Sequence, residues 1–511
     1  MNNSQKLLIA SFLFLAILTF VGPFYGDYCI ADDCVYARVT KILSEDFEFN
    51  PWLVEAPMFP TYFLGFLFSL FFGFNHIILR ISTMLLSIIL FISLIYFFKK
   101  TSLSNETSIL ASLLISFNPF VFSLSHSFMA DVPGLLFIVI SSYFFLDWFD
   151  SNKKTSFVLA LIFSVLGIYT RNFAVFVPLA AFFALLISNE RKEKITSIIV
   201  LFLFLALNAL IVLWFNYVLI GFDSHFHAAA ALSNISRIYG IPVYLGFSFI
   251  GAAILLIDFF KEKKSILKPA LLSLFLLTGA LIAFFFIPLH PIMPYYGNIL
   301  QSNGLGFLSL AGEKPFIPEL FWTIMTVVSI LSAFIFLNKI ISKQNFLELV
   351  SRNKKTSFLF FSAVLYFLLM VFFNYFFDRF IVLILPFAFA LFLLNISNSR
   401  LIKPVLLISI LFFAGFSYYG TTDYFLARNA ADKAIQSLEI ERIAFNEIKA
   451  NHEFCAQNFP RELHEGTACM DEGLATYWIV FSSLSNCKEK NSFEESFFFI
   501  KEKAFVLTEC H

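Results

Sequence analysis

Apolar runs of about 17–25 residues, separated by short polar segments, recur along the chain through residue 419. A run of this length crosses roughly 30 Å of hydrocarbon as an α-helix. The pattern predicts about thirteen spans of this kind. They lie near residues 7–24, 79–98, 108–124, 133–149, 156–170, 173–188, 195–220, 241–260, 269–288, 319–338, 357–376, 380–397 and 404–419. We therefore expect an α-helical polytopic membrane protein.

The apolar stretch at residues 58–74 is interpreted differently, as an outer-surface juxtamembrane helix in the first outer loop. Pro57 and Pro60 suit the start of such a helix. If the stretch crossed the membrane, every later loop would change sides. The distribution of charge argues against that.

Short cytoplasmic loops are enriched in Lys and Arg. With a cytoplasmic N-terminus and no span at 58–74, the basic clusters share the cytoplasmic side. They lie at residues 99–100, 153–154, 191–194, 261–268, 339–355 and 400–403. The sequence thus predicts a multi-pass protein of the cytoplasmic membrane.

After residue 419 charges reach the density of a soluble protein, so we divide the chain into residues 1–419, with the first outer loop at 25–78, and residues 420–511. The second part opens with an amphipathic pattern near 423–450 and ends with "FFFIKEKAFVLTE". We expect a small extracytoplasmic α/β domain there.

The composition excludes a soluble domain, and the charge gives no indication of a nucleic-acid-binding protein. The chain has 511 residues, of which 59% are hydrophobic and 14% charged, with a mean hydropathy of +0.82. Soluble domains have about 45–50% apolar and about 25% charged residues. The net charge is zero, so no basic surface for nucleic acid is indicated.

The cysteines share the predicted outer side; they are Cys29, Cys34, Cys455, Cys469, Cys487 and Cys510. An even number outside the cytoplasm indicates disulfides. Cys29 and Cys34 are near enough in sequence to close a small loop around Asp32 and Asp33, and two unpaired thiols are the alternative. The pairing of the other four stays open.

Ionisable residues gather at the outer ends of the predicted spans: Asp32, Asp33, Arg80, His126, Asp131, Arg171, Arg237, His290, Asp378 and Arg379. Ionisable groups at membrane depth are costly and usually mark function. Their one-sided distribution favours one outward-facing polar cavity over a path through the membrane.

Such a cavity suits an enzyme that handles a lipid-linked phosphate. Asp32 or Asp33 could take a proton from an acceptor hydroxyl, and the arginines could stabilise a phosphate leaving group. An apolar groove would hold the lipid chain.

Simpler roles stay open for each of these residues. The two adjacent acids could be solvated, or could cap a helix that starts near Val35. Arg80 and Arg171 could extend to the headgroups. The sequence establishes no cofactor. A divalent cation at Asp32, Asp33 and Asp131 is an alternative, although hard cations want several oxygen ligands.

The order of short motifs resembles the GT-C superfamily of integral-membrane glycosyltransferases, which includes the dolichyl-phosphate-mannose protein mannosyltransferases and the aminoarabinose transferase of lipid A. The first outer loop has the acidic pair in "ADDCVYARVTKIL" and the helix "EAPMFPTYFLGFLFSLFFG", before "LRISTMLL". An acid opens a later span in "SHSFMADVPGLLF", a cation breaks "LGIYTRNFAVFVPLA", and an acid–Arg–aromatic box occurs in "FFDRFIVLILPFAFA".

The resemblance implies that residues 1–419 form a catalytic domain that moves a hexose or pentose, with inversion, from a polyprenyl-phosphate-linked donor. The acceptor would be a glycan, lipid or protein outside the cytoplasmic membrane. Asp32 would be the general base, and Asp33 and Asp131 take the other acidic positions.

The resemblance also implies a site for the donor phosphate, at Arg379 and Arg171. The aminoarabinose transferase has a Lys before its double proline where this chain has "EAPMFP", so Arg80 or Arg237 would have to replace it. Tyr36, His126, Tyr295 and Tyr296 are our candidates to line the substrate site, although the last two could be interfacial anchors.

Two other classes of function remain as alternatives. A transporter or lipid flippase usually places ionisable residues near the bilayer midplane, whereas the predicted mid-span positions here are almost purely apolar. A membrane scaffold would bind a partner through residues 420–511.

Overall fold

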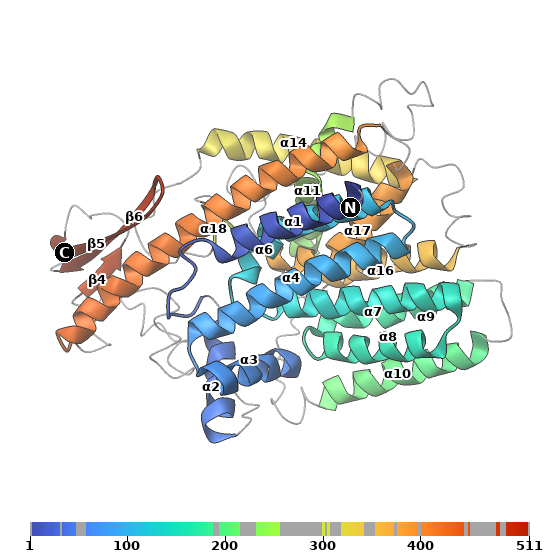
Figure 1. The fold of residues 1–511 in the computed structure, drawn as a ribbon, viewed down its shortest axis with the longest axis horizontal. Helices are drawn as coiled ribbons and strands as arrows, with labels where there is room; N and C mark the ends of the chain where they lie inside the picture. The colour runs from blue at the N-terminus through green and yellow to red at the C-terminus, as the bar shows by residue number, and fades with distance from the viewer. Residues whose placement is uncertain are drawn as a thin grey trace.

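A bundle of long helices makes up most of the structure, and a small sheet lies at one end (Figure 1). This computed structural model describes residues 3–30, 33–47, 58–187, 194–214, 231–255, 299–301, 304–306, 318–341, 353–372, 376–396, 400–443, 448–449, 477–480 and 487–508. The first half contains α1 (Asn3–Phe20), α2 (Asp33–Asp46), α3 (Phe59–Phe72), α4 (His76–Lys100), α5 (Asn105–Ser116), α6 (Pro119–Ser125), α7 (Asp131–Ser151), α8 (Lys154–Ile168), η2 (Asn172–Val175), α9 (Phe176–Ile187), α10 (Lys194–Trp214) and α11 (Ala231–Ser248).

The second half adds helices and short strands. They are η4 (Ile250–Leu255), β1 (Leu300–Gln301), β2 (Gly304–Leu305), α14 (Glu319–Ile341), α16 (Lys354–Phe372), η5 (Asp378–Ile384), α17 (Leu385–Ile396), α18 (Ile402–Ile440), β3 (Ile448–Lys449), β4 (Tyr477–Val480), β5 (Lys488–Phe497) and β6 (Ile500–Thr508).

Within the described ranges, eight helices are long and apolar enough to cross a membrane, or nine spans if α5 and α6, bent by 66°, form one. The protein is thus a multi-pass membrane protein, as the sequence predicts. α3, α8 and the η2–α9 pair are shorter apolar helices. The predicted total near thirteen stays a prediction, and the span expected at 269–288 lies outside the described residues.

The stretch expected to lie on the membrane surface is α3, which packs against α2 and α4. Its 14 residues rise about 21 Å, which is short of the roughly 30 Å of hydrocarbon that a span must cross. A proline stands in its first turn, as expected. That α3 lies along the membrane surface remains a prediction.

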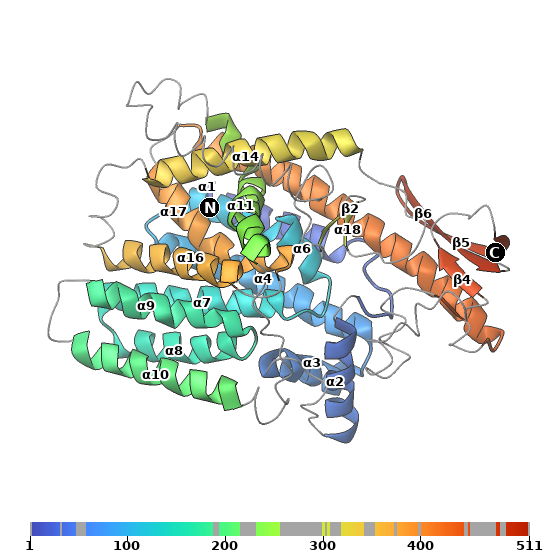
Figure 2. The same ribbon diagram turned by 180° about the vertical axis from the view of Figure 1, so that it is seen from behind.

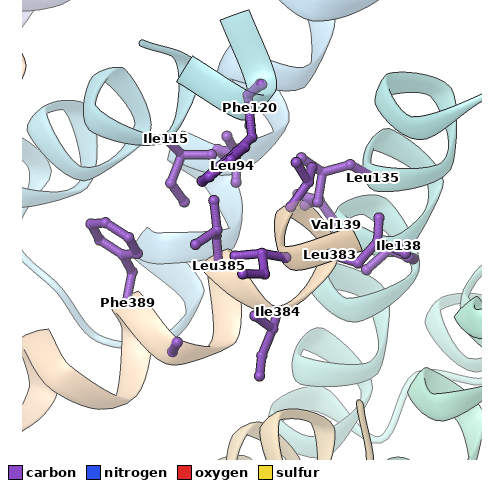
Figure 3. Packing of buried hydrophobic residues seen from close by; sticks show 14 of the residues in the cluster. Leu94, Ile115, Phe120, Leu135, Ile138, Val139, Leu383, Ile384, Leu385 and Phe389 are labelled. Atoms are coloured by element: carbon purple, nitrogen blue, oxygen red, sulfur yellow. The ribbon is translucent and has the colours of Figure 1, made fainter. Parts of the chain in front are cut away.

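The centre of the bundle is the continuous pair η5–α17 (Asp378–Ile396). Of the residues in its most apolar stretch, 89% are buried. Leu383, Leu385 and Phe389 project from it toward aliphatic and aromatic side chains of α4, α5, α6 and α7 (Figure 3). Since lipid chains are as apolar as leucine, close packing rather than escape from water stabilises such contacts.

Small residues let several helices approach closely. The Ser141 hydroxyl of α7 donates to the Ala160 carbonyl of α8 over 2.9 Å and lies 2.8 Å from the Ser164 hydroxyl. Gly246 of α11 faces the backbone of α14, where an added Cβ would lie 1.9 Å from the Ser329 carbonyl oxygen. Both pairs fit the small-residue packing that is typical of membrane helices.

One end of the bundle is closed by ion pairs between α4, α7 and α16. Lys100 Nζ lies 2.6 Å from an Asp147 oxygen, and Lys355 Nζ lies 2.7 Å from an Asp150 oxygen. The opposite ends of α4 and α7, where these helices begin, lie beside the first loop. The predicted polar cluster is therefore at that end.

The C-terminal sheet has four strands in the order β3-β4-β6-β5; β3 is parallel to β4, and the other neighbours are antiparallel. It packs on the last turns of α18, where Ala427, Ala430 and Ala434 share a small apolar core with Ile479 and Val506. α18 runs without a break across residue 419, so one helix connects the bundle to the sheet (Figure 2).

Candidate functional site

The loop after α1, residues 24–34, is called here the acid loop. Cys29 and Cys34 form a disulfide in it, which confirms the predicted pairing. Asp32 lies outside the described residues. Asp32 lies between Cys29 and Cys34 in the sequence, so the disulfide fixes the two ends of the segment that carries Asp32 to each other.

Asp33 begins α2, and its side chain is buried. One carboxylate oxygen accepts the backbone N–H of Ile30, and the other accepts the N–H of Phe128 over 3.1 Å. Carboxylates that bind backbone N–H groups are stabilised in their charged form. Asp33 thus connects the acid loop to the turn that precedes Asp131.

Arg80 of α4 and Arg428 of α18 hold the acid loop from two sides. Arg80 Nη1 donates to the carbonyl oxygens of Phe24 (3.1 Å) and Gly26 (2.6 Å), and Nη2 donates to that of Tyr28. Arg428 Nη2 donates to the Cys29 carbonyl oxygen over 3.3 Å. Both guanidinium groups lie against the Tyr28 ring, at 4.7 and 5.4 Å from its centroid.

The Tyr28 hydroxyl donates to Asn429 Oδ1 over 2.7 Å. Burial raises the pKa of the Tyr28 hydroxyl well above its usual range, because the charged phenolate would lose its hydration. The hydroxyl therefore remains a donor, and the loop stays tied to α18.

A second part of the site is the buried pair of Asp131 and Arg171. Asp131 begins α7, and its Oδ2 accepts a hydrogen bond from Arg171 Nη2. Arg171 lies between α8 and η2, at the break in the apolar pattern. Gly134 gives its side chain room, since a Cβ there would lie 3.0 Å from Arg171 Cγ.

Phe380 of η5 links this pair to Arg379, because the Arg171 guanidinium lies over its ring at 5.9 Å. Tyr36 of α2 is buried against Tyr62 of α3, with 6.1 Å between the ring centroids. Arg379 lies over the rings of Phe377 and Phe380, at 5.0 and 5.7 Å. The Tyr366 hydroxyl of α16 donates to the Phe380 carbonyl oxygen over 2.6 Å.

The remaining predicted site residues are distributed elsewhere. His126 is buried, and its ring nitrogens face the carbonyl oxygens of Phe122 (2.8 Å) and Thr19 (3.0 Å), which ties α6 to α1. Arg237 of α11 approaches the Val371 carbonyl oxygen at 3.5 Å. Tyr295 and Tyr296 lie outside the described residues.

The described residues offer a limited set of metal ligands. One group of three potential ligands, Cys29, Asp33 and Cys34, has its ligand atoms within 4.8 Å of one another among these residues. The sulfurs of Cys29 and Cys34 are bonded to each other, so neither cysteine is a thiolate ligand. The Asp131 carboxylate binds Arg171. A cation at Asp32 stays an alternative.

The comparisons with known proteins support this architecture. The model of the dolichyl-phosphate-mannose-protein mannosyltransferase family matches residues 55–215. An uncharacterised protein of Aquifex aeolicus (strain VF5) is 25% identical over 343 residues, which are 61% of this chain and 67% of that protein. ArnT from Cupriavidus metallidurans in the apo state matches with a TM-score of 0.51 at 10% identity, over 99% of this chain and 97% of ArnT.

The resemblance to the GT-C superfamily is confirmed. A structure of the same ArnT bound to undecaprenyl phosphate matches with a TM-score of 0.49 at 10% identity, over 98% of this chain and 97% of that one. The match to the GT-C mannosyltransferase family model includes Arg80, Asp131 and Arg171, but it begins after the acid loop and ends before Arg379.

Sequence reasoning did not identify several residues that build the site of this GT-C-like protein. Arg428 and Asn429 were assigned to the outer domain, and no local motif links them to a loop 400 positions earlier. Asp378 was predicted only as one of the ionisable residues at the outer ends of the spans. Its carboxylate instead accepts the backbone N–H groups of Ile299 (3.1 Å) and Leu300 (2.7 Å).

Proposed function

We propose that the chain transfers a sugar from a polyprenyl-phosphate-linked donor to an acceptor on the extracytoplasmic side of the membrane, with inversion and with Asp32 as general base. The resemblance to GT-C glycosyltransferases supports the class of reaction. ArnT, whose fold this chain shares, has been solved with bound undecaprenyl phosphate.

One observation carries the proposal. Motifs that are distant in the sequence meet at one end of the bundle, since Asp33 binds the Phe128 N–H three residues before Asp131, and Asp131 binds Arg171. Arg171 and Arg379 both lie over the Phe380 ring, at 5.9 and 5.7 Å. An acid loop and a group of buried cations are thus adjacent, as a displacement at a sugar phosphate requires.

In the proposed reaction an acceptor hydroxyl attacks the anomeric carbon of the donor. The new bond joins the acceptor oxygen to that carbon, and the bond between the carbon and the phosphate oxygen breaks. The hydroxyl proton passes to the Asp32 carboxylate. The polyprenyl phosphate leaves with an additional negative charge, which guanidinium groups stabilise best when they are fixed in place beforehand.

The contacts of the arginines suggest different roles for them at the donor phosphate. Three nitrogen–carbonyl hydrogen bonds already occupy Arg80, and Arg237 lies by a carbonyl of α16. Arg171 is neutralised by Asp131. We assign the main phosphate contact to Arg379, as the resemblance implies, with Arg171 orienting it. The carbonyl contacts of Arg80 assign it, together with Asp33, to the position of the acid loop.

The test uses full-length protein in nanodiscs, a panel of undecaprenyl-phosphate-linked sugars and an envelope extract as the source of acceptor. Release of undecaprenyl phosphate is measured. Asp32→Asn should abolish release, because the amide cannot take the proton. The matched control is Asp46→Asn, which removes an exposed acid at the far end of α2 and should keep full activity. Full activity of Asp32→Asn would refute the base assignment.

Arg379→Gln should lower release of undecaprenyl phosphate by about two orders of magnitude, in the range observed when one donor to a developing anion is removed. Binding of undecaprenyl phosphate, followed as a shift in thermal unfolding, should weaken in parallel. If neither changes while Arg80→Gln, with its fold intact, abolishes binding, the phosphate contact belongs to Arg80.

A further inference from the structure

The turn between β5 and β6 presents two aromatic side chains, Phe498 and Phe499, each 76% exposed. Phe498 has a φ of 54°, a backbone region that bulky side chains rarely adopt and that turns usually fill with Gly, Asn or Asp. A turn facing water gains nothing from two phenylalanines in this conformation. Their presence needs a surface that covers them.

α18 shows where the turn lies relative to the membrane. From Ile402 to Tyr419 this helix rises about 26 Å, close to the thickness of the hydrocarbon, and Leu407, Ile408 and Leu411 are exposed on it. Tyr419 therefore stands at the membrane–water boundary, where aromatic residues are enriched. Its ring centroid is 5.4 Å from that of Phe499, so the turn lies at the same level.

A groove next to the turn is lined largely by aromatic side chains, as a binding site for acyl chains would be. Its volume is about 670 Å³, and its walls include Phe321 of α14, Phe412 and Phe416 of α18, and Phe499. The Phe412 and Phe321 rings both stack on Phe416, at 5.8 and 5.9 Å. In both ribbon views the turn lies beside the start of α14 (Figures 1 and 2).

The polar groups of the groove lie at its other end. Asp423, Lys501 and Glu502 line it there. The Lys501 side chain is 68% exposed, and its Nζ lies 3.6 Å from a Glu494 oxygen. The groove thus changes from aromatic to charged along the same direction in which a bilayer changes from acyl chain to headgroup. A second protein would not require this match, whereas phospholipid does.

We propose that the β5–β6 turn docks the C-terminal sheet onto the membrane, by inserting Phe498 and Phe499 among the phospholipids of the leaflet on the acid-loop side. Acyl chains then fill the aromatic part of the groove, and the headgroups lie beside its charged part. The sheet gains a second attachment besides α18. This docking is independent of the sugar-transfer chemistry.

The experiment places the photo-crosslinking residue p-benzoylphenylalanine at positions 498 and 499 of the full-length protein, in nanodiscs of alkyne-tagged phosphatidylglycerol. Each change keeps an aromatic ring in place. Two further positions serve as references: Leu411, exposed on the candidate span, and Glu489, exposed at the far end of β5. After irradiation, tagged lipid bound to the protein is counted.

The proposal expects lipid adducts at positions 498 and 499 in yields similar to those at position 411. No lipid adduct is expected at position 489. Two results would overturn it. One is the absence of lipid adducts at both turn positions while position 411 gives them. The other is adducts that join two copies of this chain through the turn, which would make the turn a protein interface.

Discussion

At the scale of single residues, three of the predicted site residues bind backbone groups. Asp33 accepts two N–H groups, Arg80 donates to three carbonyl groups, and His126 lies between two carbonyl groups. A buried backbone group without a partner is costly. These side chains therefore give an irregular loop the hydrogen bonds that a helix or strand would otherwise supply.

The Asp131–Arg171 pair allows a sharp test at this scale. Replacing Asp131 by Asn leaves a buried guanidinium without its counter-charge, which costs about 3–5 kcal/mol. The thermal midpoint of the protein in detergent should fall by several degrees. The double variant Asp131→Asn/Arg171→Gln should recover part of the loss, because no buried charge remains.

The control for that pair is the more exposed pair Lys403–Glu106, whose side chains are 56% and 36% exposed. Exposed pairs contribute about 0–1 kcal/mol. Glu106→Gln should thus leave the midpoint nearly unchanged. Equal losses for Asp131→Asn and Glu106→Gln would show that burial of the first pair does not matter.

At the scale of elements, glycine positions decide which helices can meet. α11 and α14 touch at Gly246, whose position would bring any Cβ against the Ser329 carbonyl oxygen and the Ala333 backbone. α18, in contrast, has a glycine that faces nothing within 4 Å, Gly415. The same substitution should thus have opposite effects in the two helices.

Gly246→Ala should destabilise the protein by about 1–3 kcal/mol, the usual cost of an added methylene in a packed interface, since the contact atoms are backbone and cannot move alone. Gly415→Ala should stabilise it by about 0.5–1 kcal/mol, because alanine is the better helix former. Thermal unfolding in the same detergent measures both. A neutral Gly246→Ala would mean that α11 and α14 separate easily.

At the scale of the whole molecule, α18 is the element that joins the parts. Its Ser417 and Tyr418 hydroxyls donate to the carbonyl oxygens of Phe117 (2.7 Å) and Val21 (2.8 Å). Further along, Arg428 and Asn429 hold the acid loop. Its last turns carry the sheet. The position of the acid loop therefore depends on a helix that begins only at Ile402.

Much of this organisation follows from the sequence. Eight helices of the described residues coincide with predicted spans, because length and hydrophobicity mark them in the sequence. The Cys29–Cys34 disulfide can be predicted because only five positions separate its members. The contacts of Arg80 and Arg428 cannot be predicted, because their acceptors are backbone carbonyls, which are the same at every residue. Asp378 illustrates the same limit, since its partners are N–H groups of a distant loop.

The connection through α18 leads to the last prediction. Arg428→Met removes the hydrogen bond to the Cys29 carbonyl and the charge over Tyr28, while the methionine keeps most of the side-chain volume. Losing a hydrogen bond from a charged group costs about 1.5 kcal/mol or more, which corresponds to roughly tenfold more frequent local opening. Hydrogen exchange in a peptide covering the acid loop should accelerate by that factor. Under the proposed function, the release of undecaprenyl phosphate should also fall, because the acid loop that carries the proposed base would be less well ordered.

Lys433→Met provides the matched control on the same helix. Lys433 pairs with Glu495 of the sheet and its side chain is 58% exposed, so this variant changes a contact with the sheet and leaves the acid loop alone. Exchange in the loop and transfer should both stay at the level of the unmodified protein. If Lys433→Met accelerated loop exchange as much as Arg428→Met, the loop would be stabilised by the docking of the sheet as a whole. Arg428 would then have no specific positioning role.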